Sequence, residues 1–176
     1  METKLTILKS FFENPNKEFH IREISRIIKV NHTTVRQYLN KLVKEGHLSL
    51  SKSKLYLAYK LNISKKTLNL KLYYNLEKIR KLGLIEDLEK YYDYPVIVLF
   101  GSYAQARDDS TSDIDLCIIT DIDKDFDLRK YEKFFNREIS LHKFSKKQFN
   151  NLKKSNPHLI NNICNGIILS GTIEII

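Results

Sequence analysis

The sequence predicts an α+β protein in which a helical N-terminal part and a C-terminal part with a small mixed sheet are joined by a helical connector. Apolar residues recur every three or four positions through residues 5–43, whereas residues 93–176 alternate strand-like apolar runs with helical stretches. The charge divides in a similar place, because residues 1–66 hold 14 Lys or Arg and 5 Asp or Glu and the rest of the chain is balanced. We therefore expect three parts, at residues 1–63, 64–92 and 93–176.

Composition excludes several classes of protein. With 42% hydrophobic residues the chain is too apolar to be disordered. Its longest apolar run, Val96–Phe100, has the length of a strand, far short of the roughly 20 residues of a membrane helix. No basic segment followed by an apolar one opens the chain, so we expect a cytoplasmic protein without membrane contact. Cys117 and Cys164 lie far apart and outside any ligand-like cluster, which indicates two reduced, buried thiols.

The first part is predicted to contain three short helices and a hairpin. Apolar residues at helical spacing mark the helices, which we expect around residues 5–12, 21–28 and 35–43. Asn31 can cap the third helix with its side-chain oxygen, and Gly46 follows the end of that helix, where a residue that adopts positive φ is favoured. Beyond it, residues 48–61 alternate apolar and polar positions on either side of a polar turn, as two paired strands do.

This order of elements resembles the winged helix-turn-helix family over residues 3–62. The resemblance rests on the turn at residues 29–34 (KVNHTT) and on residues 38–48 (YLNKLVKEGHL). It implies that the third helix enters the major groove of DNA and that the hairpin, or wing, contacts the backbone or the minor groove. The residues implied to contact DNA are Thr33, Thr34, Arg36, Gln37, Asn40, Lys52 and Lys54.

The side chains of that set suit nucleic acid. Arg36 can bind guanine or phosphate and Gln37 suits adenine, while Lys52 and Lys54 would add affinity that does not depend on sequence. The same fold also serves as a protein-contact module in some complexes, and this alternative stays open. The positive charge confined to the first third of the chain favours a polyanion as the partner.

The connector is predicted to be helical. Ser64 can cap a helix whose apolar face runs from Leu68 to Ile79, and a shorter helix is expected after Gly83. Its charges are balanced, which is typical of a surface that packs between domains. An apolar face of this length also suits a homodimer, and the sequence does not decide between the two.

In the third part we expect strands at residues 96–100, 113–120 and 138–144, followed by a helical stretch at 145–165. The sharpest motif joins the first two strands: Gly101 and Ser102 end one, and ten residues later Asp113 and Asp115 open the next. Glycine lets the backbone approach a phosphate, and the amides of a helix beginning there favour an anion. The two aspartates project from one face about 7 Å apart and can share Mg²⁺ ions around a phosphoryl displacement.

Taken alone, Gly-Ser is a common turn and Asp-x-Asp a common pair of surface acids. Their combination resembles the nucleotidyltransferase superfamily of the polymerase-beta type, and within it the minimal nucleotidyltransferases, over residues 82–172. The resemblance implies transfer of a nucleoside monophosphate from ATP or another nucleoside triphosphate to a hydroxyl. It assigns Gly101 and Ser102 to the triphosphate and Asp113 and Asp115 to Mg²⁺.

The sequence departs from the family pattern at two places. A basic residue and a glycine commonly follow Ala104, but here Gln105 and Ala106 do, and Arg107 is the nearest residue that can supply the positive charge. The family's third carboxylate usually lies on a later strand. Here Ser140 falls at the expected position, and Glu138 shares its face one step, about 7 Å, away. We expect Glu138 to lie close enough to contribute as the third catalytic carboxylate.

Two functions follow from these resemblances. The first is a DNA-binding, Mg²⁺-dependent nucleotidyltransferase, most simply an adenylyltransferase, that acts as the antitoxin-type partner of a separate HEPN protein in a toxin–antitoxin pair. The alternative is a transcriptional regulator whose transferase domain binds nucleotide but turns it over weakly or not at all. Both predict DNA binding, so only the fate of the nucleotide distinguishes them.

Overall fold

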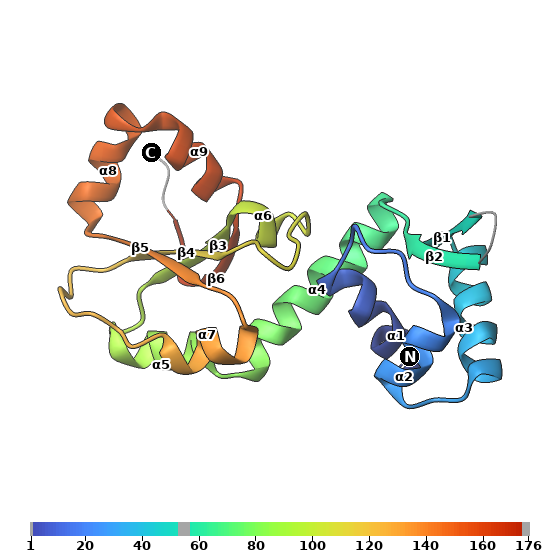
Figure 1. The fold of residues 1–176 in the computed structure, drawn as a ribbon. Helices are drawn as coiled ribbons and strands as arrows, with labels where there is room; N and C mark the ends of the chain where they lie inside the picture. The colour runs from blue at the N-terminus through green and yellow to red at the C-terminus, as the bar shows by residue number, and fades with distance from the viewer. Residues whose placement is uncertain (1, 53–56, 174–176) are drawn as a thin grey trace. The chain divides into compact units, whose positions relative to one another are not determined.

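The computed structural model describes residues 2–52 and 57–173 (Figure 1). The chain divides into two compact units, Met1–Lys71 and Leu72–Ile176. The first is mainly helical with a small antiparallel sheet, and the second contains a four-stranded mixed sheet. The predicted α+β class is therefore confirmed. No helix in the described ranges has the length and apolarity needed to cross a membrane.

The first unit contains the three helices and the hairpin in the predicted order. Its elements are α1 (Glu2–Glu13), α2 (Ile21–Ile28), α3 (His32–Lys44), β1 (Leu48–Lys52) and β2 (Leu57–Leu61). The strands β1 and β2 are antiparallel, with Leu48 opposite Leu61. The segment between α1 and α2 pairs with β2, because the backbones of Phe19 and Tyr59 exchange two hydrogen bonds of 2.8 and 2.9 Å. Both side chains lie in the core of the unit.

Local signals in the sequence explain where α3 begins and ends. The side-chain oxygen of Asn31 accepts a hydrogen bond from the backbone N–H of Thr34 at 2.8 Å, so this residue caps the helix as predicted. Gly46 follows the helix with φ of +77°, in the left-handed region that glycine adopts most readily. The buried side of α3 consists of Val35, Leu39 and Leu42.

His47 is buried where β1 approaches the helix that follows the wing. Its Nδ1 lies 3.2 Å from the Thr67 hydroxyl, and Nε2 lies 3.9 Å from the Glu45 carboxylate. Burial lowers the pKa of His47, nearby Lys4 and Lys66 lower it further, and Glu45 acts in the opposite direction. The imidazole is therefore held toward its neutral form in the folded chain.

The residues expected as a connector form α4 (Lys65–Lys81) and α5 (Leu84–Tyr91). Ser64 caps α4, accepting from the backbone N–H of Thr67 at 3.3 Å. The helix begins in the first unit and ends in the second, where Ile79 is buried. Leu84, Ile85 and Leu88 of α5 belong to the same core, so this helix is part of the second unit.

The second unit is built on a sheet with the order β5-β4-β3-β6. The strands β3 (Val96–Phe100) and β4 (Ile114–Ile119) are antiparallel, β3 and β6 (Ile167–Ser170) are antiparallel, and β4 and β5 (Ile139–Phe144) are parallel. The remaining elements are α6 (Gly101–Ala104), α7 (Arg129–Phe135), α8 (Lys146–Ser155) and α9 (Pro157–Cys164). The predicted small mixed sheet is therefore confirmed.

Helices cover both faces of this sheet (Figure 1). On one face Ile97, Leu99 and Leu116 pack with residues of α5 and α7. On the other Val98, Phe100 and Cys117 pack with Phe149 of α8 and with α9. Cys117 is fully buried, which raises the pKa of its thiol to about 12, and it forms no disulfide. Asp115 belongs to this second face, because β-strand side chains alternate.

The structure differs from the sequence prediction at three elements of this unit. The helix α7 and the strand β6 were not predicted. The helical stretch expected at residues 145–165 consists of two helices, because Asn156 ends α8 and caps α9 by accepting from the N–H of Leu159, and Pro157 occupies the first turn of α9.

Candidate functional site

The Gly-Ser and Asp-x-Asp motifs lie together at one end of the sheet. Gly101 directly follows β3, and Asp115 lies opposite Phe100, the last residue of β3, in the antiparallel pair. Strand pairing therefore carries the carboxylate of Asp115 to the turn at which α6 begins. Ser102 is half-buried in that single-turn helix, and the backbone N–H of Arg107 donates to its carbonyl oxygen at 2.9 Å.

Gly101 and Asp115 are packed so closely that a side chain at position 101 would require the Asp115 carboxylate to move. A Cβ atom on Gly101 would overlap Oδ2 of Asp115 and lie 3.0 Å from its Cγ. The φ of Gly101 is +70°, which disfavours any side chain there. Two independent features, the backbone conformation and the Asp115 carboxylate, therefore favour glycine at this position.

The two aspartates differ in their surroundings. Asp113 is exposed at the entry to β4, whereas Asp115 is half-buried. Burial raises the pKa of Asp115, the neighbouring Asp113 carboxylate raises it further, and His142 acts in the opposite direction. The negative charge of Asp115 is thus poorly compensated by the protein, and a bound cation would stabilise it.

The parallel pairing of β4 and β5 determines which residue stands beside the pair. Asp115 lies opposite Ser140, and Cys117 lies opposite His142. Ser140 thus occupies the ladder position adjacent to Asp115 on the same face. His142 is on that face as well, with its ring centroid 5.2 Å from that of Phe100.

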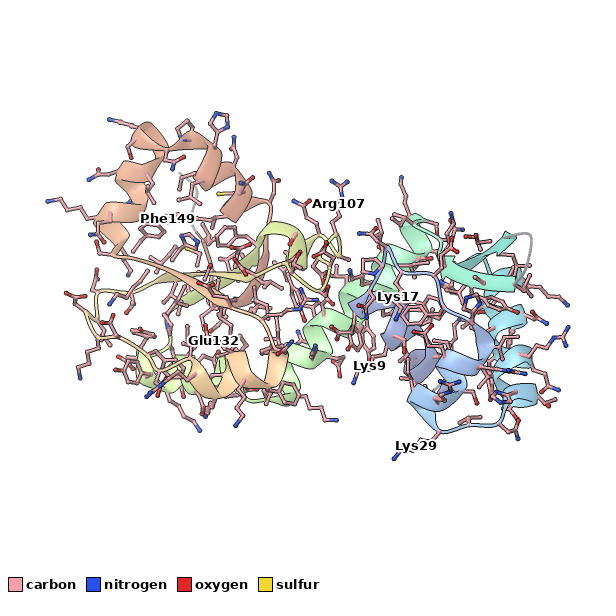
Figure 2. The ribbon with its side chains drawn as sticks, in the orientation of Figure 1. Lys9, Lys17, Lys29, Arg107, Glu132 and Phe149 are labelled. Carbon is pink, nitrogen blue, oxygen red and sulfur yellow. The ribbon has the colours of Figure 1, made fainter. Side chains whose placement is uncertain are left out.

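Glu138 lies just before β5 and is exposed. Its carbonyl oxygen accepts from the N–H of Ile114 at 3.0 Å, so its backbone runs beside Asp113. The described residues contain no cluster of three or more His, Cys, Asp or Glu side chains that could hold a metal, and the Glu138 carboxylate is therefore not grouped with Asp113 and Asp115. Arg107 is also exposed, and Figure 2 shows its side chain extending away from the loop after α6.

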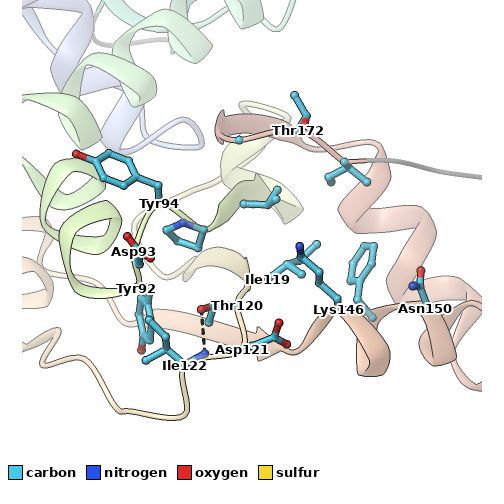
Figure 3. Close-up of a pocket in the computed structure, with 15 residues that line it drawn as sticks. Tyr92, Asp93, Tyr94, Ile119, Thr120, Asp121, Ile122, Lys146, Asn150 and Thr172 are labelled. Atoms are coloured by element: carbon cyan, nitrogen blue, oxygen red, sulfur yellow. Dashed lines mark hydrogen bonds between the residues drawn. The ribbon is translucent and has the colours of Figure 1, made fainter.

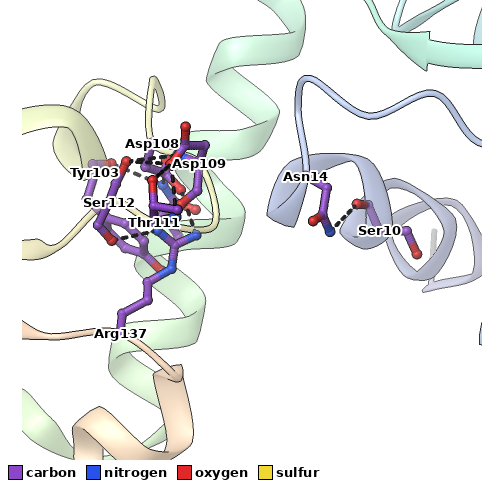
Figure 4. Close-up of polar contacts among 9 residues, drawn as sticks. Ser10, Asn14, Tyr103, Asp108, Asp109, Thr111, Ser112 and Arg137 are labelled. Carbon is purple, nitrogen blue, oxygen red and sulfur yellow. Dashed lines mark hydrogen bonds and ion pairs between the residues drawn. The ribbon is translucent and has the colours of Figure 1, made fainter.

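Sequence reasoning missed a buried polar network next to these motifs (Figure 4). Arg137 and Asp108 form an ion pair whose side chains are 3% and 2% exposed, with Nη2 of Arg137 3.4 Å from Oδ2 of Asp108. The Asp108 carboxylate also accepts from Asn75 Nδ2 at 2.9 Å. Nothing in the local pattern indicates this network, because its members come from residues 75, 108 and 137, which lie far apart in the sequence.

In the first unit, the outer face of α3 carries the residues expected to contact DNA. Thr33, Arg36, Gln37 and Asn40 are exposed and Thr34 is half-buried. The Tyr59 hydroxyl donates to Oδ1 of Asn40 at 3.1 Å, which turns the amide NH₂ of Asn40 away from Tyr59. Exposed lysines of the unit include Lys9, Lys17 and Lys29 (Figure 2). Lys52 ends β1, and Lys54 lies outside the described residues.

A separate cavity opens at the opposite end of β3 and β4 (Figure 3). It lies where β3 begins and β4 ends, between Tyr94, Thr120 and Lys146. None of the residues that line it belongs to the Gly-Ser or Asp-x-Asp motif. We place the candidate site at the motifs because the Asp115 carboxylate approaches Gly101 there, next to Ser102 in the chain.

Comparison with known families agrees with this geometry. Residues 83–173, just over half of the chain, match the family described as "Polymerase beta, Nucleotidyltransferase". The chain belongs to this nucleotidyltransferase family. Residues 1–49 match the family described as "Bacterial regulatory protein, arsR family". The matched ranges contain the Gly-Ser and Asp-x-Asp motifs in one case and α3 in the other, so the predicted fusion of a helix-turn-helix with a nucleotidyltransferase is confirmed.

Among solved structures, this nucleotidyltransferase-family chain is similar to one entitled "Possible transcriptional regulator" from Methanosarcina mazei Go1. The two are 21% identical, with a TM-score of 0.37, over 52% of this chain and 78% of the other. The search of curated proteins finds no match. Nucleotidyltransferases of this family generally act on nucleoside triphosphates with a divalent metal.

Proposed function

We propose that this protein is a DNA-binding regulator whose nucleotidyltransferase domain binds ATP, or another nucleoside triphosphate, together with Mg²⁺. The observation that carries the proposal is the contact between the Asp115 carboxylate and the α-carbon of Gly101. It brings the residues proposed for the triphosphate, Gly101 and Ser102, next to those proposed for the metal, Asp113 and Asp115. The regulatory half of the proposal is supported by the arsR-family match and by the positive charge of residues 1–66.

The donor set of the site suits Mg²⁺. Asp113 and Asp115 supply carboxylate oxygens, which are the ligands that Mg²⁺ prefers, and the raised pKa of Asp115 marks a charge that a cation would offset. When bound, the metal would neutralise the charge of the triphosphate. Ser102 can donate its hydroxyl to a phosphate oxygen, while the space that a side chain at position 101 would take is filled by the Asp115 carboxylate. Arg107 is proposed to add positive charge from the adjacent loop.

Slow turnover is the expected consequence of Ser140. Transfer of a nucleoside monophosphate requires the acceptor hydroxyl to lose its proton, a step for which a positioned carboxylate is suited. The ladder position beside Asp115 holds a serine instead, whose hydroxyl is a weak base. We therefore infer that this domain binds nucleotide but turns it over slowly, and that nucleotide binding serves regulation.

A second candidate is an active transferase in which Glu138 supplies the missing carboxylate. It is favoured by the hydrogen bond between the Glu138 carbonyl and the N–H of Ile114, which brings the Glu138 backbone alongside Asp113. A change of the exposed side chain's rotamer would then direct its carboxylate to the pair. A HEPN-type partner chain, and transfer of AMP within such a pair, belong to this candidate.

The double variant Asp113→Asn, Asp115→Asn tests the site. It keeps the size of both side chains and removes both charges, so titration calorimetry should show loss of the Mg²⁺-dependent part of ATP affinity. An unchanged urea unfolding midpoint serves as the control for folding, and DNA affinity should stay unchanged because residues 1–66 belong to the other unit. Unchanged binding of ATP with Mg²⁺ in the double variant would refute the site.

Transfer distinguishes the two candidates. Incubation of the full chain with labelled ATP and Mg²⁺, in the presence of protein and nucleic-acid acceptors, should leave the label on free nucleotide if the regulator proposal holds. Label that moves to an acceptor, and that stops moving in Glu138→Gln, would establish the transferase instead.

A further inference from the structure

The segment at residues 108–112 lies between the Gly-Ser turn and the Asp-x-Asp pair. Arg137 forms hydrogen bonds to it (Figure 4). Nη1 of Arg137 donates to the carbonyl oxygens of Asp109 and Ser112, the second at 2.8 Å. Its Nη2 faces the Asp108 carboxylate at 3.4 Å. One guanidinium therefore binds three of the five residues of the segment. Its centre also lies 5.6 Å from the centroid of the Tyr103 ring, which limits the rotation of the side chain.

The same network reaches the Gly-Ser turn. Asn75 Nδ2 donates both to the Asp108 carboxylate at 2.9 Å and to the Tyr103 carbonyl at 3.0 Å. Tyr103 directly follows Ser102 in α6. The described part of the chain has no buried side-chain nitrogen or oxygen without a partner, so this network is fully satisfied. A fully satisfied buried network has one preferred geometry, which it imposes on the backbone around it.

Arg137 and Glu138 form hydrogen bonds to the peptide groups on both sides of Asp113. The carbonyl bound by Arg137 at Ser112 belongs to the peptide bond that leads into Asp113. The next N–H, that of Ile114, donates to the carbonyl of Glu138 at 3.0 Å. Two consecutive residues thus fix the peptide planes before and after Asp113. The side chain of Asp113 is exposed, and β4 begins one residue later.

We infer that Arg137 is a positioning residue for the nucleotide site. Through the segment at residues 108–112, it fixes Asp113 relative to Ser102. The inference rests on the proposed function, because it gives Arg137 its role through nucleotide and Mg²⁺ binding. A guanidinium is required because its planar fork donates to two carbonyls and a carboxylate at once, whereas the ammonium of lysine is a point charge on a flexible stem.

Stability alone is a poor explanation for this arrangement. A buried ion pair often contributes little net stability, because the cost of removing two charges from water offsets their attraction. The hydrogen bonds of Arg137 go to backbone carbonyls of a segment between two motifs. A variant that keeps the buried positive charge beside Asp108 can therefore separate the effect of Arg137 on affinity from its effect on folding.

The variant Arg137→Lys tests the inference in the full chain. Lysine keeps the charge beside Asp108 but cannot reach both carbonyls. We expect backbone amides of Asp109, Thr111 and Ser112 to exchange with solvent about tenfold faster, and ATP with Mg²⁺ to bind about tenfold more weakly. The matched control is Arg129→Lys, which makes the same change at an exposed ion pair with Asp127 and should alter neither quantity.

A substitution at Asp109 provides a second test, which is needed if Arg137→Lys does not fold. Oδ1 of Asp109 accepts from the N–H and hydroxyl of Thr111 and from the hydroxyl of Ser112. Asp109→Ala removes these bonds, whereas Asp109→Asn keeps an oxygen acceptor. We expect the alanine variant alone to raise both the exchange rates and the dissociation constant several-fold.

The outcomes separate this inference from the proposed function. Faster exchange with unchanged affinity, or a lower unfolding temperature with neither effect, would overturn the positioning role while leaving the nucleotide site intact. If the unaltered protein bound no ATP with Mg²⁺, the proposed function would fail, and the role of Arg137 in binding would fail with it. Exchange and affinity that change together in Arg137→Lys or in Asp109→Ala support the inference.

Discussion

At the scale of single residues, Gly101 offers the most direct test of the packed motifs. Gly101→Ala introduces a Cβ that overlaps the Asp115 carboxylate and forces an L-residue into a positive φ. The backbone conformation alone should cost about 1–2 kcal/mol of unfolding free energy. Displacement of Asp115 should in addition weaken binding of ATP with Mg²⁺, which calorimetry would measure alongside urea unfolding.

Gly83 provides a matched control for this variant. Its φ of +67° is nearly that of Gly101, but the nearest atom to an added Cβ is Glu86 Oε2, 3.9 Å away. Gly83→Ala should therefore destabilise the chain by a similar amount and leave nucleotide affinity unchanged. Equal affinities in both alanine variants would mean that the contact between Gly101 and Asp115 has no part in binding.

His47 predicts how the stability of the chain depends on pH. Its pKa is lowered in the folded state, chiefly by burial, so the unfolded chain, with a histidine pKa of about 6.5, binds the proton more readily. The stability due to neutral His47 is therefore fully present above about pH 6.5 and is lost as the pH falls toward the lowered pKa. Urea midpoints measured at pH 7.5 and pH 5 should differ more in the unaltered protein than in His47→Gln.

At the scale of elements, local chemistry decided which helices and strands could be predicted from the sequence. The ends of α3 were predictable because Asn31 and Gly46 act within a few residues of their own positions. The two elements that were missed are short: α7 buries only Tyr131 and Phe135, and β6 has four residues. Neither is long enough to show a periodicity, and only the sheet and its core select their conformations.

The candidate site was partly predictable for the same reason. Gly101, Ser102, Asp113 and Asp115 form a motif whose spacing is visible along the chain, and strand pairing brings them together. The partner of Asp115 depends on the register between β4 and β5, in which Ser140 lies opposite it. Arg137 could not be found at all, because its partners are 25 to 29 residues away and its own neighbours, Asn136 and Glu138, are polar and exposed.

The exposed face of α3 gives a prediction for DNA binding. Arg36→Ala removes a positive charge from the proposed recognition helix and should cost about 1–3 kcal/mol of binding free energy, with relaxed specificity if Arg36 contacts a base. Arg80→Ala removes the same charge from an exposed position of α4 in the second unit and should cost much less. Fluorescence anisotropy with a labelled duplex would compare the DNA affinities of the two variants. Equal losses of affinity would argue against α3 as the helix that contacts the bases.

At the scale of the whole molecule, the uneven charge makes DNA binding the property most sensitive to salt. All of the formal excess of +9 lies within residues 1–66, while residues 67–176 are balanced. Counterion release then predicts that the logarithm of the association constant falls linearly with the logarithm of the salt concentration. The acidic and basic residues of the nucleotidyltransferase domain should contribute little to that slope.

Lys52 and Lys54 test where the slope arises. If both contact phosphates, Lys52→Ala with Lys54→Ala should weaken binding to all sequences alike and flatten the salt slope by about 1.8. Titrations between 50 and 200 mM salt, on specific and random duplexes, would measure both effects. A double variant that lost affinity for the specific duplex alone would instead assign the wing to base recognition.

The serine opposite Asp115 has a consequence for how turnover and folding are related. Ser140 fits the ladder between β4 and β5 without disturbing the pairing on either side of it, so the fold does not depend on an acid at that place. Under the proposed function, turnover and folding therefore depend on different residues. We expect an acid at position 140 to alter turnover of the nucleotide while the strand register and the contact between Gly101 and Asp115 stay as they are.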